Sequence, residues 1–308
     1  VGAFALAGIG DIPTIAVAAR HSNDAVRMGG LLALRRLERT EIAYFLNDTN
    51  ERIVLEAARA INDIPISGAT RELAGIEYPP AKTRNYTELS TPLLRRVLNA
   101  NYRYGTKESA AQVAAIASTD GLPEQARVEA RRDLAEWESP SGRDRVSGLW
   151  RPVVGPRSER HAVEAIEPAI ARLLQSAPDS VRAAAANTAA ALELTPVADT
   201  LLALVQSSGA PWPRVASLRA LAAEKDERHA AAVQAAQNDP QEELRREALK
   251  FQSRLKPSTA IAQIERVLEN GTMGEKQSAL GTLGSMNEKQ ADAILLAWLD
   301  KLQAGTVP

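Results

Sequence analysis

The sequence predicts an all-α solenoid of stacked helix pairs, and three observations carry this prediction. Hydrophobic residues make up 45% of the 308-residue chain but aromatic residues only 4%, and an apolar content rich in Ala and Leu favours closely packed helices over half-buried strands. A short residue pattern recurs along the chain, most often every 31 or 32 residues, which is typical of stacked helix pairs. Turns containing Asn, Asp and Ser separate the expected helices. We therefore expect about seven to nine helix pairs, with atypical pairs at the two ends.

The recurring pattern marks the second helix of each expected pair. It usually consists of a branched apolar residue, an Arg or another polar residue, two variable positions, and a small or apolar residue. Its copies span residues 26–30, 53–57, 94–98, 126–130, 181–185, 213–217, 244–248 and 275–279. The two widest intervals contain polar excursions, around residues 66–90 and 138–160. A solenoid tolerates insertions at the joints between pairs, so we expect two sub-arrays, residues 1–137 and 161–308, on either side of the longer excursion.

The segments around each copy have the chemistry of helix starts and of first helices. Asn or Asp precedes several copies, at Asn23-Asp24, 47–50, Asp179-Ser180 and 238–240, and such side chains accept hydrogen bonds from the free N–H groups of the following helix. First helices show apolar residues three and four positions apart, as in 166–174 and 261–268. Each helix pair is thus expected to bury its two apolar faces against its neighbours.

The second-helix pattern resembles that of HEAT repeats. The copies closest to that family are Asp24-Ala25-Val26-Arg27 and Asp179-Ser180-Val181-Arg182. Two further stretches, residues 56–63 and 144–152, resemble the HEAT-repeat segment of large exported bacterial proteins that also carry a sorbosone or glucose dehydrogenase-like β-propeller and a c-type cytochrome domain. This resemblance implies a periplasmic or exported protein in which neighbouring domains of the same polypeptide perform the redox chemistry.

Two features of the sequence bear on the context of the chain. It begins with Val1, and residues 3–9 have the character of the middle of a helix, which suggests a piece of a longer or processed protein. No run of 18 or more apolar residues occurs, so we expect a soluble domain without a membrane span.

The Pro-, Gly- and Arg-rich excursion at residues 138–160 is the main candidate for an interaction site. Its candidate contact residues are Arg143, Arg145, Trp150 and Arg151. In one interpretation the segment is a docking loop for an adjacent domain, with Trp150 as apolar anchor, because Trp and Arg concentrate the binding energy of interfaces. In the other it is a strap along the solenoid, with Trp150 buried in the chain's own groove. The excursion around Tyr78-Pro79-Pro80 and Asn85-Tyr86 is the next candidate, or else a solvated connector.

The repeats contain two other notable features, a recurring arginine and Trp212. The recurring arginines occupy one position of the pattern and are Arg27, Arg95, Arg127, Arg182, Arg214 and Arg245. They form either an inter-repeat ladder with turn carboxylates and carbonyl groups, which we favour, or the lining of an anion-binding groove. Trp212, between Pro211 and Pro213, is expected to pack at the start of a second helix.

The composition argues against several classes of function. The chain has no cysteine and only three widely separated histidines, His21, His161 and His229, so we expect no metal, haem or other cofactor. The near-neutral formal charge of -1 argues against nucleic acid as a partner, and no nucleophile elbow or phosphate-binding loop is found. We therefore expect a monomeric, non-catalytic scaffold that binds proteins or neighbouring domains. The alternative is an enzyme on a helical-repeat scaffold, such as a bilin lyase or a DNA glycosylase, which would require a convergent polar cluster.

Overall fold

The computed structural model describes residues 2–77, 90–223 and 227–306, and in these ranges the regular elements are all helices. An isolated bridge between Arg143 and Trp150 is the one pairing of extended backbone among them. The prediction of an all-α helical-repeat solenoid is confirmed. Contacts divide the chain into an N-terminal unit, residues 1–169, and a C-terminal unit, residues 170–308. The division falls inside helix α9 (Glu159–Ser176), so the excursion at 138–160 belongs to the N-terminal unit.

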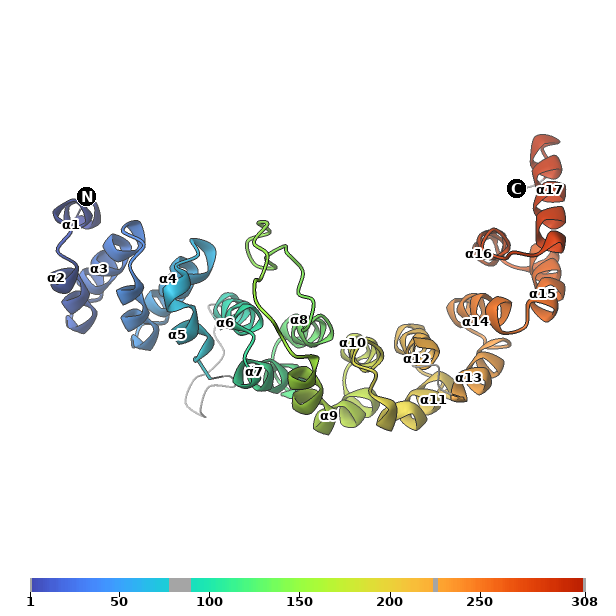
Figure 1. Cartoon of the computed structure of the whole chain (residues 1–308), viewed down its shortest axis with the longest axis horizontal. Coiled ribbons are helices and arrows are strands. Elements are labelled where there is room, and N and C mark those ends of the chain that lie inside the picture. Colours follow the sequence, from blue (N-terminus) through green and yellow to red (C-terminus); the bar gives the residue numbers. More distant parts are fainter. Residues whose placement is uncertain (1, 78–89, 224–226, 307–308) are drawn as a thin grey trace. The chain divides into compact units, whose positions relative to one another are not determined.

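In the N-terminal unit, second helices lie side by side along one side and first helices along the other (Figure 1). The second helices are α3 (Asp24–Arg36), α4 (Glu51–Asp63), α6 (Ser90–Tyr104) and α8 (Glu124–Ala135). The first helices are α2 (Ile12–Val17) with η1 (Ala18–Arg20), η2 (Thr40–Asn47), η3 (Ser67–Ala69) with α5 (Thr70–Ala74), and α7 (Lys107–Ser118). Helix α1 (Gly2–Ile9) packs on α3 at the end of the stack.

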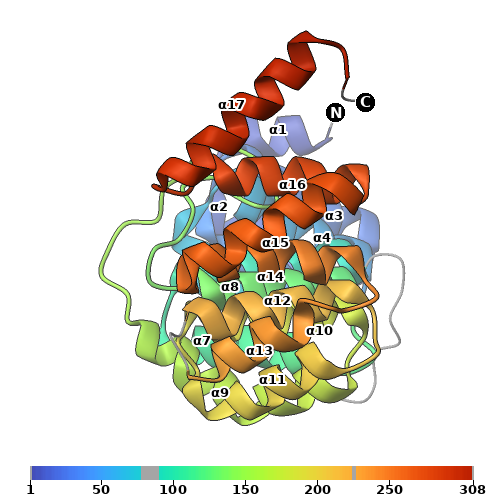
Figure 2. The same ribbon diagram turned by 90° about the vertical axis from the view of Figure 1, so that its right-hand side faces the viewer.

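The C-terminal unit repeats the same arrangement. Its second helices are α10 (Asp179–Ala191), α12 (Pro211–Ala223), α14 (Glu242–Leu255) and α16 (Met273–Leu283). Its first helices are η4 (Thr195–Val197) with α11 (Ala198–Gln206), α13 (Arg228–Ala236), α15 (Pro257–Asn270) and α17 (Lys289–Gln303). Helix α17 diverges from α16 and stands clear at the end of the unit (Figure 2).

Every copy of the second-helix pattern lies in one of these second helices, as the sequence predicts. Asn23 and Asn50 cap α3 and α4 as expected, since their side-chain oxygens accept hydrogen bonds from the N–H groups of Ala25 and Arg52. The prediction was less accurate for α10, whose N-cap position is Pro178 and makes no side-chain bond. There, Asp179 instead pairs with Arg182 in the first turn.

The excursion around residues 66–90 contains a first helix that the sequence does not suggest. Helix α5 is only five residues long, yet its Leu73 is fully buried and the helix packs on α6. The candidate segments Tyr78-Pro79-Pro80 and Asn85-Tyr86 lie outside the described residues.

Small residues allow the helices of each unit to approach closely. In α4, Ala57, Ala58 and Ala60 are completely buried. At Gly30 in α3, a Cβ atom would lie 2.6 Å from the Cβ of Ala18, so a larger residue would push the first helix away. In the C-terminal unit, a core of buried Leu, Ile and Ala side chains runs from α14 through α15 and α16 to α17.

The recurring arginines form a ladder of intramolecular contacts, as favoured from the sequence. Four of them bond to an acidic residue of the following pair, in the pairs Arg27 with Asp48, Arg95 with Glu129, Arg214 with Asp239, and Arg245 with Glu275. Arg127 and Arg182 pair with acids next to their own helix, Asp120 and Asp179. Arg27, Arg95, Arg214 and Arg245 therefore link neighbouring helix pairs.

Two further observations complete the fold. Trp212 lies in the first turn of α12 with 65% of its surface exposed, so it adds little to the packing expected there. No helix in the described ranges is both long enough and apolar enough to cross a membrane.

Candidate functional site

The candidate site is the connecting loop, residues 136–158, which joins α8 to α9. In Figure 1 it rises on the side of the N-terminal unit where the second helices lie. Within it, residues 142–151 form a hairpin. The hairpin is closed by hydrogen bonds from Asp144 N–H to the Leu149 carbonyl, at 2.8 Å, and from Arg151 N–H to the Gly142 carbonyl, at 2.7 Å. The loop is thus an ordered structure with its own backbone pairing.

Trp137 anchors the start of the connecting loop. It is completely buried, and its ring lies 6.2 Å from the ring of Tyr102. The guanidinium of Arg157, from the other end of the loop, stacks 4.2 Å from the Trp137 ring and 5.1 Å from the Tyr102 ring. Gly105 permits this approach, because a Cβ there would lie 3.0 Å from the guanidinium carbon and its φ of +74° suits glycine. Both ends of the loop are therefore fixed at one aromatic cluster.

The titratable groups of this cluster are shifted by their burial. Burial raises the pKa of the Tyr102 hydroxyl to about 12 and lowers the pKa of Arg157. Burial also raises the pKa of Asp133, although the guanidinium of Arg145, which forms an ion pair with it, acts in the opposite direction. Arg145 also bonds to Glu136 at 2.6 Å. In this cluster Arg145 is paired with two carboxylates, whereas Arg157 is held by its contacts with the two rings.

Asp144 anchors the hairpin in a second way. Its buried carboxylate accepts hydrogen bonds from the Ser147 N–H at 2.8 Å, from the Asn99 amide at 3.0 Å and from Arg151 at 3.1 Å. The same Arg151 nitrogen donates to the backbone carbonyl of Asn62, at 2.7 Å. Because Asn62 lies in α4 and Asn99 in α6, these bonds tie the hairpin across two neighbouring repeats.

The ionisation of Asp144 makes this attachment depend on pH. Burial opposes its charge, but the bonds from Ser147, Asn99 and Arg151 outweigh it and hold the pKa of Asp144 below its ordinary value. Arg103, 3.8 Å away, is the other cation that faces it. A lowered pKa in the folded state stabilises the chain above the unfolded pKa of about 3.9, and the contribution is lost as the pH falls through the folded pKa.

We therefore expect Asp144→Asn to lower the melting temperature near neutral pH, and the deficit to shrink as the pH falls below about 4. Thermal unfolding of both proteins, followed by circular dichroism across the pH range, measures the difference. A deficit that stays constant into strong acid would show that the charge of Asp144 does not contribute.

One face of the connecting loop presents apolar side chains to solvent. Trp150 is 74% exposed, and Leu149 and Val154 are also exposed. One part of the Trp150 ring rests on Gly142, where a Cβ would lie only 2.6 Å from the ring. Opposite Trp150 on the hairpin is the exposed Arg143, which donates to the Gly148 carbonyl at 3.0 Å. We call Arg143, Leu149, Trp150 and Val154 the exposed face of the loop.

The four candidate residues thus fall into two groups. Arg143 and Trp150 lie on the exposed face of the loop, whereas Arg145 and Arg151 are part-buried and bond to Asp133, Asp144 and Glu136. The interpretation as a strap with a buried Trp150 is wrong for that residue, because Trp137 fills the chain's own core instead. The loop is held against its own chain by Asp144, Arg145 and Arg151, and it leaves Trp150 exposed.

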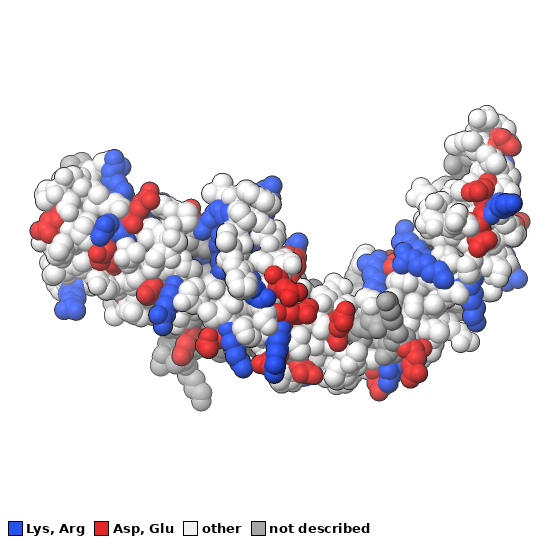
Figure 3. Space-filling view, viewed as in Figure 1, with Lys and Arg blue, Asp and Glu red and all other residues white. Residues whose placement is uncertain are grey.

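Elsewhere on the molecule, few features suggest small-molecule chemistry. Across the described ranges, no group of three or more His, Asp or Glu residues is placed to hold a metal ion. On the visible face of each unit, basic and acidic side chains lie close to one another (Figure 3). Ion pairs between neighbouring repeats include Arg96 with Asp63, Arg219 with Glu247 and Arg228 with Asp199.

Comparisons with known proteins find similar solved structures but no matching family model or curated protein. No protein-family model matches the sequence, and no curated protein matches it. Among solved structures, it is similar to two engineered proteins from a structural genomics consortium. One is 16% identical with a TM-score of 0.48, covering 96% of this chain and 83% of the other. The second is 18% identical with a TM-score of 0.42, covering 68% of this chain and 92% of the other.

Proposed function

We propose that this chain is a non-catalytic scaffold that binds a protein partner through the exposed face of the connecting loop. The observation that carries the proposal is the exposure of Trp150 on a hairpin that is otherwise held by its own chain. Tryptophan and arginine contribute much of the binding energy at protein interfaces. A preformed loop also loses little conformational entropy on binding, so the energy of burying Trp150 is retained as affinity.

The partner that we propose is a neighbouring domain of the same polypeptide in an exported bacterial redox protein. The resemblance of residues 56–63 and 144–152 to the repeat segment of such proteins supports this choice. The second of these stretches includes most of the hairpin and Trp150 itself. Catalysis would then belong to the partner domain, and the repeats would position it.

Site-specific photo-crosslinking tests this proposal. A photoreactive phenylalanine analogue replaces Trp150 in the chain, expressed in the cells that naturally produce it. We expect a discrete crosslinked product in which position 150 is joined to sequence outside residues 1–308, because a buried interface holds the probe within reach of its partner.

The matched control places the same probe at Trp212, which is 65% exposed but lies on an ordinary helix start. This control should give no discrete product. Crosslinks from position 150 that lead only to the chain's own second helices, or equal products from both positions, would contradict the proposal.

A further inference from the structure

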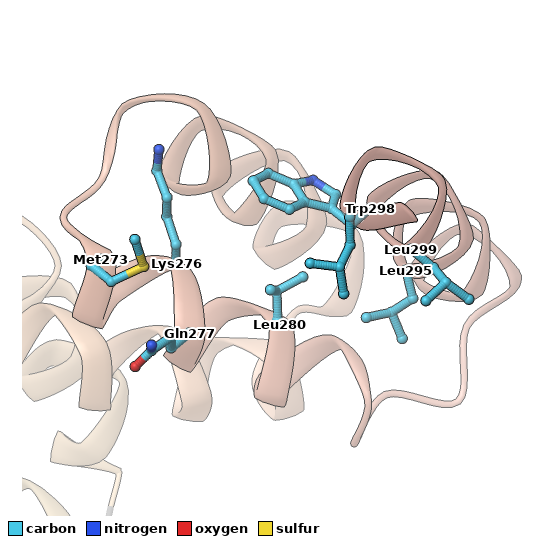
Figure 4. Close-up of a pocket in the computed structure, with 8 residues that line it drawn as sticks. Met273, Lys276, Gln277, Leu280, Leu295, Trp298 and Leu299 are labelled. Carbon is cyan, nitrogen blue, oxygen red and sulfur yellow. The ribbon is translucent and has the colours of Figure 1, made fainter. Parts of the chain in front are cut away.

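An apolar groove lies open at the end of the C-terminal unit, between α16 and α17. It has a volume of about 330 Å³ and is lined mainly by Met273, Leu280, Leu295, Trp298, Leu299 and Leu302. Figure 4 shows the side chains from α16 and α17 on the two sides of this opening. Leu299 is 49% exposed and Leu302 61% exposed, although both belong to the apolar face of a regular helix.

The groove continues the hydrophobic core of the unit. The core cluster of α14, α15 and α16 includes Leu280, Leu295 and Trp298 as partly buried members. The same three residues line the groove, so one apolar surface passes from the interior to the solvent. Exposed apolar surface that is contiguous with a core commonly marks a binding site.

The repeat geometry identifies the kind of element that fits there. Three second helices of this unit pack against the preceding second helix and against their own first helix: α12 on α10 and α11, α14 on α12 and α13, and α16 on α14 and α15. A further helix added by the same rule would contact α16 and α17, and the groove lies between these two helices.

The arginine ladder identifies the charge that this helix should carry. At the ladder position, Arg214 and Arg245 pair with Asp239 and Glu275, which lie just before or in the first turn of the next second helix. The residue at the same position of the last copy is Lys276, which lines the groove. No carboxylate in the described ranges forms an ion pair with Lys276.

We infer that this groove binds an amphipathic helix of a partner protein that carries an acidic residue at its N-terminal end. The helix lies on α16 and α17 as a further second helix would, with its apolar face on Leu299 and Trp298. Its acidic residue pairs with Lys276. This surface belongs to a different unit from the connecting loop, so the inference does not depend on the proposed function.

A peptide copy of α14 with its preceding turn, residues 238–255, serves as the probe. This segment already has the required features in the chain, because it packs on a first and a second helix and its Asp239 pairs with Arg214. The fluorescently labelled peptide is titrated with the whole chain, and fluorescence anisotropy reports binding. We expect saturable binding that Leu299→Asp weakens at least about tenfold, since a charge would replace a buried apolar contact.

The matched control is Leu255→Asp in the chain, at a leucine of the same unit that is 47% exposed and lies outside the groove. It should leave the affinity unchanged, and circular dichroism should show that both variants are folded. No saturable binding below about 1 mM peptide, or equal affinity for Leu299→Asp and the unmodified chain, would overturn the inference.

A double-mutant cycle tests the ion pair. Lys276→Glu should weaken the acidic peptide about two- to fivefold. It should have no effect on a peptide in which Asp239, Glu242 and Glu243 are replaced by Asn, Gln and Gln. Sedimentation of the chain alone tests a different occupant. Concentration-dependent dimers that Leu299→Asp abolishes would assign the groove to a second copy and overturn the inference.

Discussion

Replacing Trp137 with alanine is expected to lower the free energy of unfolding of the N-terminal unit by about 3 to 5 kcal/mol. The side chain is completely buried, so its removal leaves a cavity, and the neighbouring side chains lose their van der Waals contacts with it. Arg157 would lose the closer of its two ring contacts, while its buried nitrogens have no hydrogen-bond partner in the described ranges. Urea denaturation followed by circular dichroism measures the change.

Trp212→Ala is the control for this prediction, because Trp212 is of the same residue type but largely exposed. Its effect should stay within about 0.5 kcal/mol. In the Trp137→Ala protein, we also expect faster hydrogen exchange in the connecting loop, since both of its ends depend on the same cluster. Equal stability of the two variants would mean that Trp137 does not anchor the loop.

The sequence predicts the second helices well because two local signals coincide in them. The apolar and small residues repeat with the helical period, and the basic residue at the ladder position recurs with the repeat. The ladder arginines were also predictable, because a residue fixed by the repeat period has the same neighbours in each copy. Asp48 and Asp239, for example, occupy corresponding turns before α4 and α14.

The short first helices could not be predicted in the same way. Helices η2 and α5 are each too short to show a helical period, and their burial comes from packing on α4 and α6. Tertiary contacts, rather than local propensity, determine such elements. The sequence therefore indicates only a polar excursion around residues 66–90, although Leu73 is a core residue.

The two tryptophans of the loop region differ in how far the sequence predicts their burial. Trp137 follows Ala130 and Leu134 of α8 at spacings of four and three, so helical periodicity alone assigns it to the buried face. Trp150 lies in a hairpin, where no period operates. Its exposure depends on the attachment of Asp144 and Arg151 to α6 and α4, which are distant in sequence.

Trp150→Ala is expected to have its large effect on binding and not on stability. The ring is mostly in solvent and rests on Gly142, so its removal should change the free energy of unfolding by less than about 1 kcal/mol. At an interface centre, truncation of an aromatic anchor costs about 2 kcal/mol or more, which corresponds to roughly 30-fold in affinity. Arg145 and Arg151 are unsuitable for this test, because their truncation would remove the bonds that attach the loop to the repeats.

Isothermal titration calorimetry with the partner domain that crosslinks to position 150 tests the central claim most directly. The affinities of the unmodified chain, Trp150→Ala and Trp212→Ala are compared, and their melting temperatures are measured alongside. Weakening by roughly 30-fold in Trp150→Ala alone, with all three melting temperatures alike, is the result we predict. Equal affinities for the three proteins, or a loss of binding that accompanies a loss of folding, would contradict the claim that the loop presents Trp150 to a partner.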